Sequence, residues 1–183
     1  SDQKVMSTYP SRLDASEHKI IWDLSNPTAV GFGIDLSYQE SDQMHWFVKC
    51  NHCGWDWYFD WPDDNGVIDP RCHFIDVKLV IRACGRCKKE ISHKALCFGH
   101  WVAKRPERPT RGYWISQLFA PWKSPLELIQ ASRGDPEIFH NFNLGKAYSP
   151  TDLLVDRATI LRASSPGDTT LHNVVMGVDN GVH

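Results

Sequence analysis

Two Cys-x-x-Cys pairs, Cys50 with Cys53 and Cys84 with Cys87, are the residues of this chain best suited to chemistry. Each spacing lets two thiolates converge on one cation from a tight turn. Four thiolates at about 2.3 Å from the ion complete the closed tetrahedral site of a structural zinc. The 30 residues between the pairs suffice for two β-hairpins that face each other. The sequence therefore predicts a structural Zn²⁺ held by all four cysteines, with disulfides or free thiols as the alternative.

Glycines and two further cysteines accompany these pairs. Gly54 and Gly85 lie beside the ligands, where we expect a left-handed or otherwise strained backbone. Cys72 and Cys97 have no partner at a matching spacing. Cys72 precedes His73 and is a weak spare ligand, so we expect both extra cysteines to be packed or incidental. Paired Cys-x-x-Cys motifs without a visible secretory signal favour metal binding in a reducing compartment.

The composition narrows the class of protein. The 183 residues are 42% hydrophobic and 23% charged, which is typical of one globular domain or two small ones. A formal charge of −2 argues against a chain that coats nucleic acid indiscriminately. No apolar run approaches the roughly 20 residues that a membrane span needs. Eight tryptophans are many for this length, and we favour rings that cover a thin metal-binding domain over a surface that stacks bases.

Periodicity places the elements that would position the cysteines. Strands are expected over 44–49 and 55–61 around the first pair, and over 78–83 before the second pair, with a return through 90–101. A further strand is expected over 112–119. Helices are expected over 35–41, after a capping box at Ser124 and Glu127, and over 136–144 with Gly145 as its stop. Residues 104–111 are basic and proline-rich and form a connector, or a patch that contacts phosphate.

Two weaker signals lie outside the cysteine region. The apolar run 20–24 predicts a short strand that leads into the loop Ser25-Asn26-Pro27-Thr28, which by itself is an ordinary proline turn. Near the other end, the apolar run 173–178 precedes Asp179, which is flanked by glycines. An aspartate at the end of a buried strand is a common part of a metal-dependent phosphoryl-transfer site, and it is also a common turn residue.

The order and spacing of many short motifs resemble the large terminase subunit of tailed bacteriophages, a DNA-packaging protein with an ATPase and a nuclease. The matching motifs, besides the four cysteines, are Arg12-Leu13-Asp14-Ala15-Ser16, Ser25-Asn26-Pro27-Thr28, Gly31-Phe32-Gly33-Ile34, Tyr38, Ser41-Asp42-Gln43, Trp46, Gly99-His100-Trp101, Gly112-Tyr113-Trp114-Ile115-Ser116-Gln117-Leu118, Pro121-Trp122, Phe142-Asn143-Leu144-Gly145 and Tyr148. The resemblance implies an α+β segment in which a small four-cysteine zinc ribbon of β-hairpins is inserted into part of an α/β ATPase, followed by C-terminal helices.

The resemblance also implies domain limits. Residues 1–43 would be the end of the ATPase core, 44–103 the ribbon, 104–148 a return to the ATPase-like subdomain, 149–172 a linker and 173–183 the first strand of an RNase H-like nuclease. Such a middle segment is either a piece of a longer protein or a natural split product, and both remain open.

Roles for individual residues follow from the same resemblance. Ser25, Asn26, Pro27 and Thr28 would form the loop that senses the nucleotide γ-phosphate and couples hydrolysis to DNA movement. Asp179 would be the first of the nuclease carboxylates that hold two divalent cations. Because this sequence has no Walker A loop and only one such carboxylate, we expect Mg²⁺ and ATP to be cofactors of the complete motor and not of this chain alone.

The expected partners are other terminase segments or subunits, the portal and double-stranded DNA, in the cytoplasm of a host that carries the phage or prophage. The alternative function is a stand-alone zinc-ribbon module that binds DNA or protein. Its basic candidates are Arg71, Lys78, Arg82, Arg86, Lys88 and Lys89. Acidic residues on the first hairpin, such as Asp56 and Asp60, oppose a uniform DNA-binding surface, so a protein partner is equally compatible.

Overall fold

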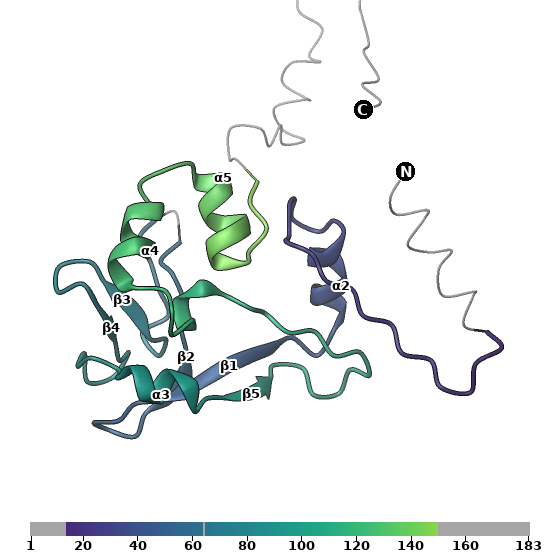
Figure 1. Cartoon of the computed structure of the whole chain (residues 1–183), viewed down its shortest axis with the longest axis horizontal. Helices are drawn as coiled ribbons and strands as arrows, with labels where there is room; N and C mark the ends of the chain where they lie inside the picture. Colours follow the sequence, from purple (N-terminus) through teal and green to yellow (C-terminus); the bar gives the residue numbers. More distant parts are fainter. Residues whose placement is uncertain (1–13, 64, 150–183) are drawn as a thin grey trace, which may run out of the picture. The chain divides into compact units, whose positions relative to one another are not determined.

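The computed structural model describes residues 14–63 and 65–149, which form short strands and short helices (Figure 1). In chain order the elements are α2 Ile34–Glu40, β1 Met44–Lys49, β2 Asp56–Tyr58, β3 Phe74–Asp76, β4 Ile81–Ala83, α3 His93–Cys97, β5 His100–Ala103, the 3₁₀-helix η2 Gln117–Phe119, α4 Pro125–Ala131, α5 Pro136–Ile138 and the π-helix η3 Phe139–Leu144. The expected mixture of α and β structure is confirmed. No helix in the described part of the chain is long and apolar enough to span a membrane.

Two small antiparallel sheets carry the cysteine turns. The first has the strand order β2-β1-β5, and the second pairs β3 with β4. The expected strand over 44–49 is confirmed as β1, which pairs Val48 with Trp57 of β2 and Trp46 with Trp101 of β5. The expected strand over 55–61 is real but shorter, because beyond Tyr58 the backbone turns to the segment before β3 through a bridge from Phe59 to His73.

The second sheet differs from the prediction of one strand over 78–83. That strand is confined to β4, and an unexpected strand, β3, precedes it. The side chain of Asp76 accepts hydrogen bonds from the backbone N–H groups of Lys78 and Leu79, at 2.9 and 3.0 Å. Val80 takes a left-handed φ of 57°. This local turn overrides the strand preference of the apolar residues in 77–80.

The return from the second cysteine pair includes a helix that the strand pattern did not predict. Ser92 caps α3, because its hydroxyl accepts a hydrogen bond from the N–H of Ala95. The chain then enters β5. Helix α2 confirms the expected helix near 35–41.

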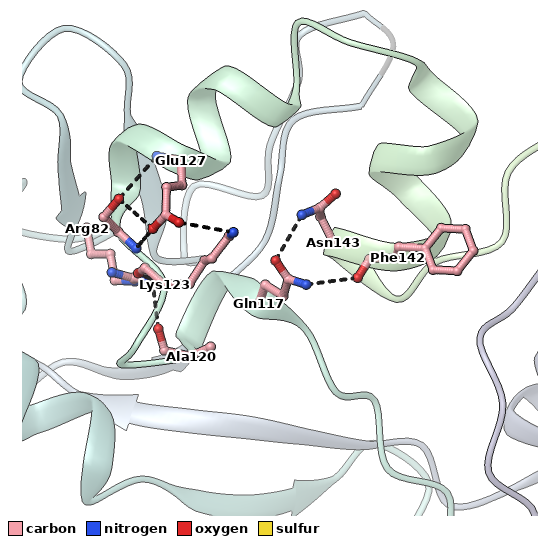
Figure 2. A network of polar contacts seen from close by, with 8 residues as sticks. Arg82, Gln117, Ala120, Lys123, Glu127, Phe142 and Asn143 are labelled. Carbon is pink, nitrogen blue, oxygen red and sulfur yellow. Dashed lines mark hydrogen bonds and ion pairs between the residues drawn. The ribbon is translucent and has the colours of Figure 1, made fainter.

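The predicted strand over 112–119 is wrong. Only Tyr113 bridges to Met44 of β1, and residues 117–119 form η2. Side chains of this segment bond to the end of η3 instead. The Trp114 indole donates to Leu144 O at 2.8 Å. Gln117 donates to Phe142 O at 3.2 Å (Figure 2). These distant acceptors hold the segment in an irregular path.

The capping box at the start of α4 is confirmed, with Ser124 and Glu127 each bonding the other's backbone N–H. The helix predicted over 136–144 is present as α5 followed by the π-helix η3. Gly145 ends it with a left-handed φ of 65°, as expected. The wider turns of η3 coincide with the carbonyls that accept side-chain hydrogen bonds from 114–117.

The run 20–24 forms no strand with any described residue, contrary to the prediction. The side chains of Ile20, Trp22 and Leu24 are exposed, and Leu24 is 85% accessible. A strand needs a neighbour for its backbone N–H and C=O groups, and none lies beside this run in the described part of the chain. Residues 1–13, residues 150–172 of the predicted linker, and the predicted strand 173–183 with Asp179 lie outside the described residues.

One hydrophobic core joins the cysteine region to the residues that follow it. Val48 and Phe59 belong to the same buried cluster as Leu118, Leu128 and Leu144. Full burial of one such side chain stabilises the fold by about 1.5–3 kcal/mol. Helix α4 contacts β4, η2 and η3, so the segment after the ribbon covers the ribbon's face.

A buried arginine reinforces this contact. Arg82 of β4 is 6% exposed and donates to the carbonyls of Leu118, Ala120 and Lys123 at 2.7, 3.0 and 2.6 Å. Figure 2 shows Arg82 with Ala120 and Lys123. Burial lowers its pKa below the ordinary arginine value. Three carbonyl acceptors replace the water that the guanidinium loses.

Candidate metal centre

The four cysteines come together from two turns that face each other. Cys50 follows β1 and Cys53 lies in the turn before β2. Cys84 follows β4, and Cys87 lies in a turn that a bridge between Ala83 and Glu90 closes. Cys50 and Cys84 are buried, Cys87 is half-buried and Cys53 is exposed. One side of the cluster is thus sealed by the core and the other faces solvent.

The sulfur positions fit a single tetrahedral ion. All four Sγ atoms lie within 4.8 Å of one another, with Cys50 to Cys87 at 3.8 Å and Cys53 to Cys84 at 3.7 Å. A tetrahedron with metal–sulfur bonds of about 2.3 Å has edges of about 3.8 Å. A disulfide would bring two sulfurs to about 2.05 Å. The geometry therefore favours a metal site over the disulfide alternative, and all six cysteines of the chain are unpaired thiols.

The two turns have the same backbone design. The N–H of Gly54 donates to Cys50 O at 3.0 Å, and the N–H of Lys88 donates to Cys84 O at 3.0 Å. Both donors have a left-handed φ, 70° for Gly54 and 60° for Lys88. In the first turn the N–H of His52 also points to the sulfur of Cys50, at 3.4 Å. The expectation of a left-handed backbone is confirmed at Gly54, and its equivalent in the second turn is Lys88.

Gly85 is required for a different reason than the one expected from the sequence. Its φ is not left-handed, but a Cβ atom there would collide with the carbonyl oxygens of Arg71 and Cys72. The close approach allows the N–H of Gly85 to donate to Nδ1 of His73 at 3.2 Å. His73 is fully buried, and its Nε2 lies 2.8 Å from Val48 O. With Nε2–H as the donor, one neutral imidazole links β1 to the second cysteine turn.

Burial and hydrogen bonding act differently on the metal-free thiols. A backbone hydrogen bond from Trp55 lowers the pKa of exposed Cys53 to about 7. Burial raises the pKa of Cys84 to about 12. Metal binding must therefore displace a tightly held proton from Cys84. Four sulfur ligands suit zinc, leave no coordination position for water or substrate, and indicate a structural ion.

The remaining cysteines do not belong to this group. Cys72 is buried against Tyr58, and burial raises its pKa to about 11. Cys97 ends α3 and is exposed. In 14–63 and 65–149, the four clustered cysteines are the one group of three or more metal-ligating side chains with converging donor atoms.

Tryptophans cover the ribbon, as the favoured interpretation predicted. Trp46, Trp55 and Trp61 are partly buried against the core. Trp46 meets Trp101 edge-on at 5.1 Å between ring centroids, and Trp61 meets Phe139 in the same way at 5.0 Å. These rings extend a core that would otherwise be thin around the metal site.

The structure changes the list of basic residues that could contact a partner. Arg71, Lys78, Arg86, Lys88 and Lys89 are exposed, as a contact requires. Arg82 is not available, because its guanidinium is buried beneath the 118–123 segment. No sequence pattern indicated this burial, or the role of His73, because the partners of both residues lie far away along the chain.

The hydrogen bonds found for the predicted coupling loop do not join it to the cysteine turns. The Ser25 hydroxyl donates only to the neighbouring carbonyl of Asn26, at 3.1 Å. The carbonyl of Thr28 accepts from the N–H of Tyr148 at 3.3 Å, and Pro27 is half-buried. The structure thus leaves the side chains of Ser25, Asn26 and Thr28 exposed. Comparisons with protein-family models, with curated proteins and with solved structures find no match to this chain.

Proposed function

We propose that this chain is a segment of a viral DNA-packaging motor of the large-terminase type. In this proposal the four cysteines hold a structural zinc that staples the ribbon, and Ser25-Asn26-Pro27-Thr28 is a nucleotide-coupling loop. The chain performs no ATP hydrolysis by itself, since its sequence lacks a Walker A loop. The proposal rests on the exposure of the apolar run 20–24, which immediately precedes the coupling loop.

That segment has the character of a central strand without its sheet. Ile20, Ile21, Trp22 and Leu24 form a near-continuous apolar run, which Asp23 interrupts on one face of an extended chain. Strands with this pattern are typical of parallel sheets that helices cover on both faces. All four side chains are exposed in this structure. The segment is therefore suited to insertion into an α/β sheet, such as that of an ATPase core.

The position of the loop supports the same conclusion. In open α/β sheets, ligands bind beyond the carboxyl ends of the strands. Ser25 to Thr28 follow directly at the carboxyl end of the 20–24 run. Their hydroxyl and amide groups are exposed and bond at most to nearby backbone, which leaves them able to meet a terminal phosphate.

A second apolar surface supports a large partner. Trp22, Ile115 and Trp122 line the same groove, and Trp122 is 83% exposed. Contiguous apolar surface of this kind is typical of an interface and not of a free surface. In the proposed function the remainder of the ATPase core covers this groove together with the 20–24 run.

The test is reconstitution with the Walker-containing part of the motor, either as a separate chain or within one polypeptide. We expect DNA-stimulated ATP hydrolysis only when both parts are present. Ser25→Ala and Asn26→Ala should lower kcat more than they raise KM, because the loop acts on the hydrolysis step. Asn65→Ala, an exposed asparagine in the loop between β2 and β3 and outside the matching motifs, is the matched control and should leave both constants unchanged.

Unchanged hydrolysis in Ser25→Ala and Asn26→Ala would remove the coupling role. Hydrolysis by this chain without a Walker-containing part would contradict the proposal as a whole. The second candidate function, a stand-alone ribbon that binds DNA or protein, is favoured by one observation, the exposed basic residues beside the cysteine turns.

A further inference from the structure

Four side chains beside the cysteine turns form a short stack that we call the ladder: Arg86, Trp55, Trp57 and Arg71. The rings of Trp55 and Trp57 are stacked, with centroids 5.9 Å apart and planes 18° from parallel. The guanidinium carbon of Arg86 lies 5.7 Å from the Trp55 centroid, and that of Arg71 lies 4.8 Å from the Trp57 centroid. The Trp55 indole also donates to the Arg71 carbonyl at 2.9 Å. Contacts between cations and indole faces hold both arginines in defined positions.

The two arginines differ in whether a carboxylate pairs with the guanidinium. Arg71 forms a fork-like pair with Asp69, with its Nη2 at 2.6 Å from Oδ2. Arg86 is exposed and has no carboxylate partner in the described part of the chain. Arg71 is thus largely neutralised and helps to position the ladder, whereas the charge of Arg86 is available to a ligand.

Two lysines add to this charge at the same turns. Lys49 directly precedes Cys50, and its Cε lies 3.8 Å from where a Cβ on Gly54 would be. Lys89 comes two residues after Cys87, and both lysines are exposed, without a carboxylate partner among the described residues. Two carboxylates are neighbours of this group: Glu90 follows Lys89 in sequence, and Asp56, which pairs with His100, stands opposite Lys49 in the β1–β2 register. We call Arg86, Lys49 and Lys89 the basic turn surface.

The ladder also determines which kind of ligand fits. Arginines cover the indole rings, so these rings are not free to stack on bases or to serve as the apolar anchor of a protein interface. Charge alone would then supply the affinity. Binding through charge without a shaped apolar pocket is characteristic of contacts to the nucleic-acid backbone.

We propose that the basic turn surface binds the phosphodiester backbone of nucleic acid without sequence preference. Arg86 supplies the central contact, because its planar guanidinium can donate two hydrogen bonds to one phosphate. The inference rests on the proposed function for the identity of the natural ligand, which is then the DNA that the motor moves.

The metal site sets the shape of this surface. Arg86 lies within the turn between Cys84 and Cys87, and Trp55 comes two residues after Cys53. A bound ion holds both turns in place, and with them the two members of the ladder. Loss of the metal should therefore weaken nucleic-acid binding although no phosphate touches the ion.

The experiment measures anisotropy of a labelled DNA duplex of mixed sequence with the zinc-loaded full chain, over a series of salt concentrations. We expect affinity to fall steeply with salt. Arg86→Ala should weaken binding roughly tenfold at low salt. It should also make the slope of log K against log salt shallower by about 0.9, the loss of one phosphate contact. Arg133→Ala, an exposed arginine after α4 that is not among the candidate contact residues, is the matched control and should leave both values unchanged.

Three outcomes would overturn the inference. They are affinity that does not depend on salt, equal effects of Arg86→Ala and Arg133→Ala, and tighter binding to an acidic peptide than to DNA. A strong preference for one duplex sequence would contradict backbone contact. Zinc content of each variant, measured in parallel, ensures that a loss of binding is not a loss of the fold. These results do not depend on ATP hydrolysis, so the inference and the coupling role of Ser25 can fail separately.

Discussion

The backbone N–H of Gly85 donates to Nδ1 of His73, at 3.2 Å, inside the turn that carries Cys84 and Cys87. Through its other nitrogen the same imidazole bonds Val48 O, one strand away. A neutral, fully buried histidine therefore sets the distance between the strand before Cys50 and the turn that holds the opposite cysteines. The metal ligands depend on this side chain although it binds no metal itself.

His73 variants should separate its two hydrogen bonds. Asparagine places its oxygen near the position of Nδ1 and can keep the bond from Gly85, whereas glutamine places its amide near Nε2 and can keep the bond to Val48. We expect each to lower the free energy of unfolding by about 1–3 kcal/mol, because one buried polar group is left unpaired. Only His73→Gln should also weaken zinc affinity, as measured by competition with a chelator. Equal zinc affinities in both variants would contradict a role in positioning the second turn.

Replacement of a ligand tests the metal site directly. Cys84→Ser removes one of two buried thiolates, and we expect zinc content to fall and the ribbon to lose protection from proteolysis. Elemental analysis of freshly purified, reduced protein should give one zinc per chain. Cys97→Ser, an exposed cysteine outside the cluster, is the control and should retain full metal content. Purified wild-type protein without metal would rule out the site.

Substitutions of Lys88 test whether the backbone of the second cysteine turn is left-handed at this position. A side chain in this conformation costs roughly 1–2 kcal/mol, a cost that glycine avoids. Lys88→Ala and Lys88→Gly both lose the bond from the ammonium to Gly85 O and the contact with the Phe74 ring. The glycine variant should therefore be more stable than the alanine variant by about 1 kcal/mol in chemical denaturation. An alanine variant as stable as the glycine variant would show that the turn is not left-handed at this position.

Arg82 tests the contact between the ribbon and the segment after it. Arg82→Met keeps much of the volume but leaves the carbonyls of Leu118, Ala120 and Lys123 without their donor, so we expect a loss of about 3 kcal/mol in unfolding free energy. Arg82→Lys can restore part of the bonding and should be intermediate. If instead Arg82→Met unfolds at the same denaturant concentration as the wild type, the guanidinium is not a significant link between the two segments.

The lowered pKa of Glu127 predicts how the stability of the fold changes at acidic pH. Hydrogen bonds from Ser124, first from its backbone N–H, lower the pKa of this carboxyl from 4.5 to about 2. A carboxyl whose pKa is lowered on folding contributes stability above its ordinary pKa, and this contribution disappears as the pH falls through the folded value. Wild type should therefore lose more stability than Glu127→Gln between about pH 4.5 and pH 2. Thermal melts of both proteins across this range, with Glu137→Gln as an exposed acidic control, provide the measurement.

Sequence patterns alone determined the features whose partners are close along the chain. The cysteine spacing indicated the two turns whose four thiols come together, and the Ser124–Glu127 capping box and Gly145 marked the start of one helix and the end of another. In each case the interacting groups lie within a few residues of one another. Local propensity therefore carries the information, and the structure bears these predictions out.

Tertiary structure alone decided the features whose partners are distant. His73 bonds a carbonyl 25 residues away, and Arg82 bonds carbonyls 36 to 41 residues away. No pattern within a strand or turn records such partners. The same holds for the predicted strand over 112–119, which became irregular because Trp114 and Gln117 bond to residues of η3. Burial of a charge, the choice of a left-handed lysine and the pairing of strands follow from which distant groups pack together, and only the folded chain brings those groups into contact.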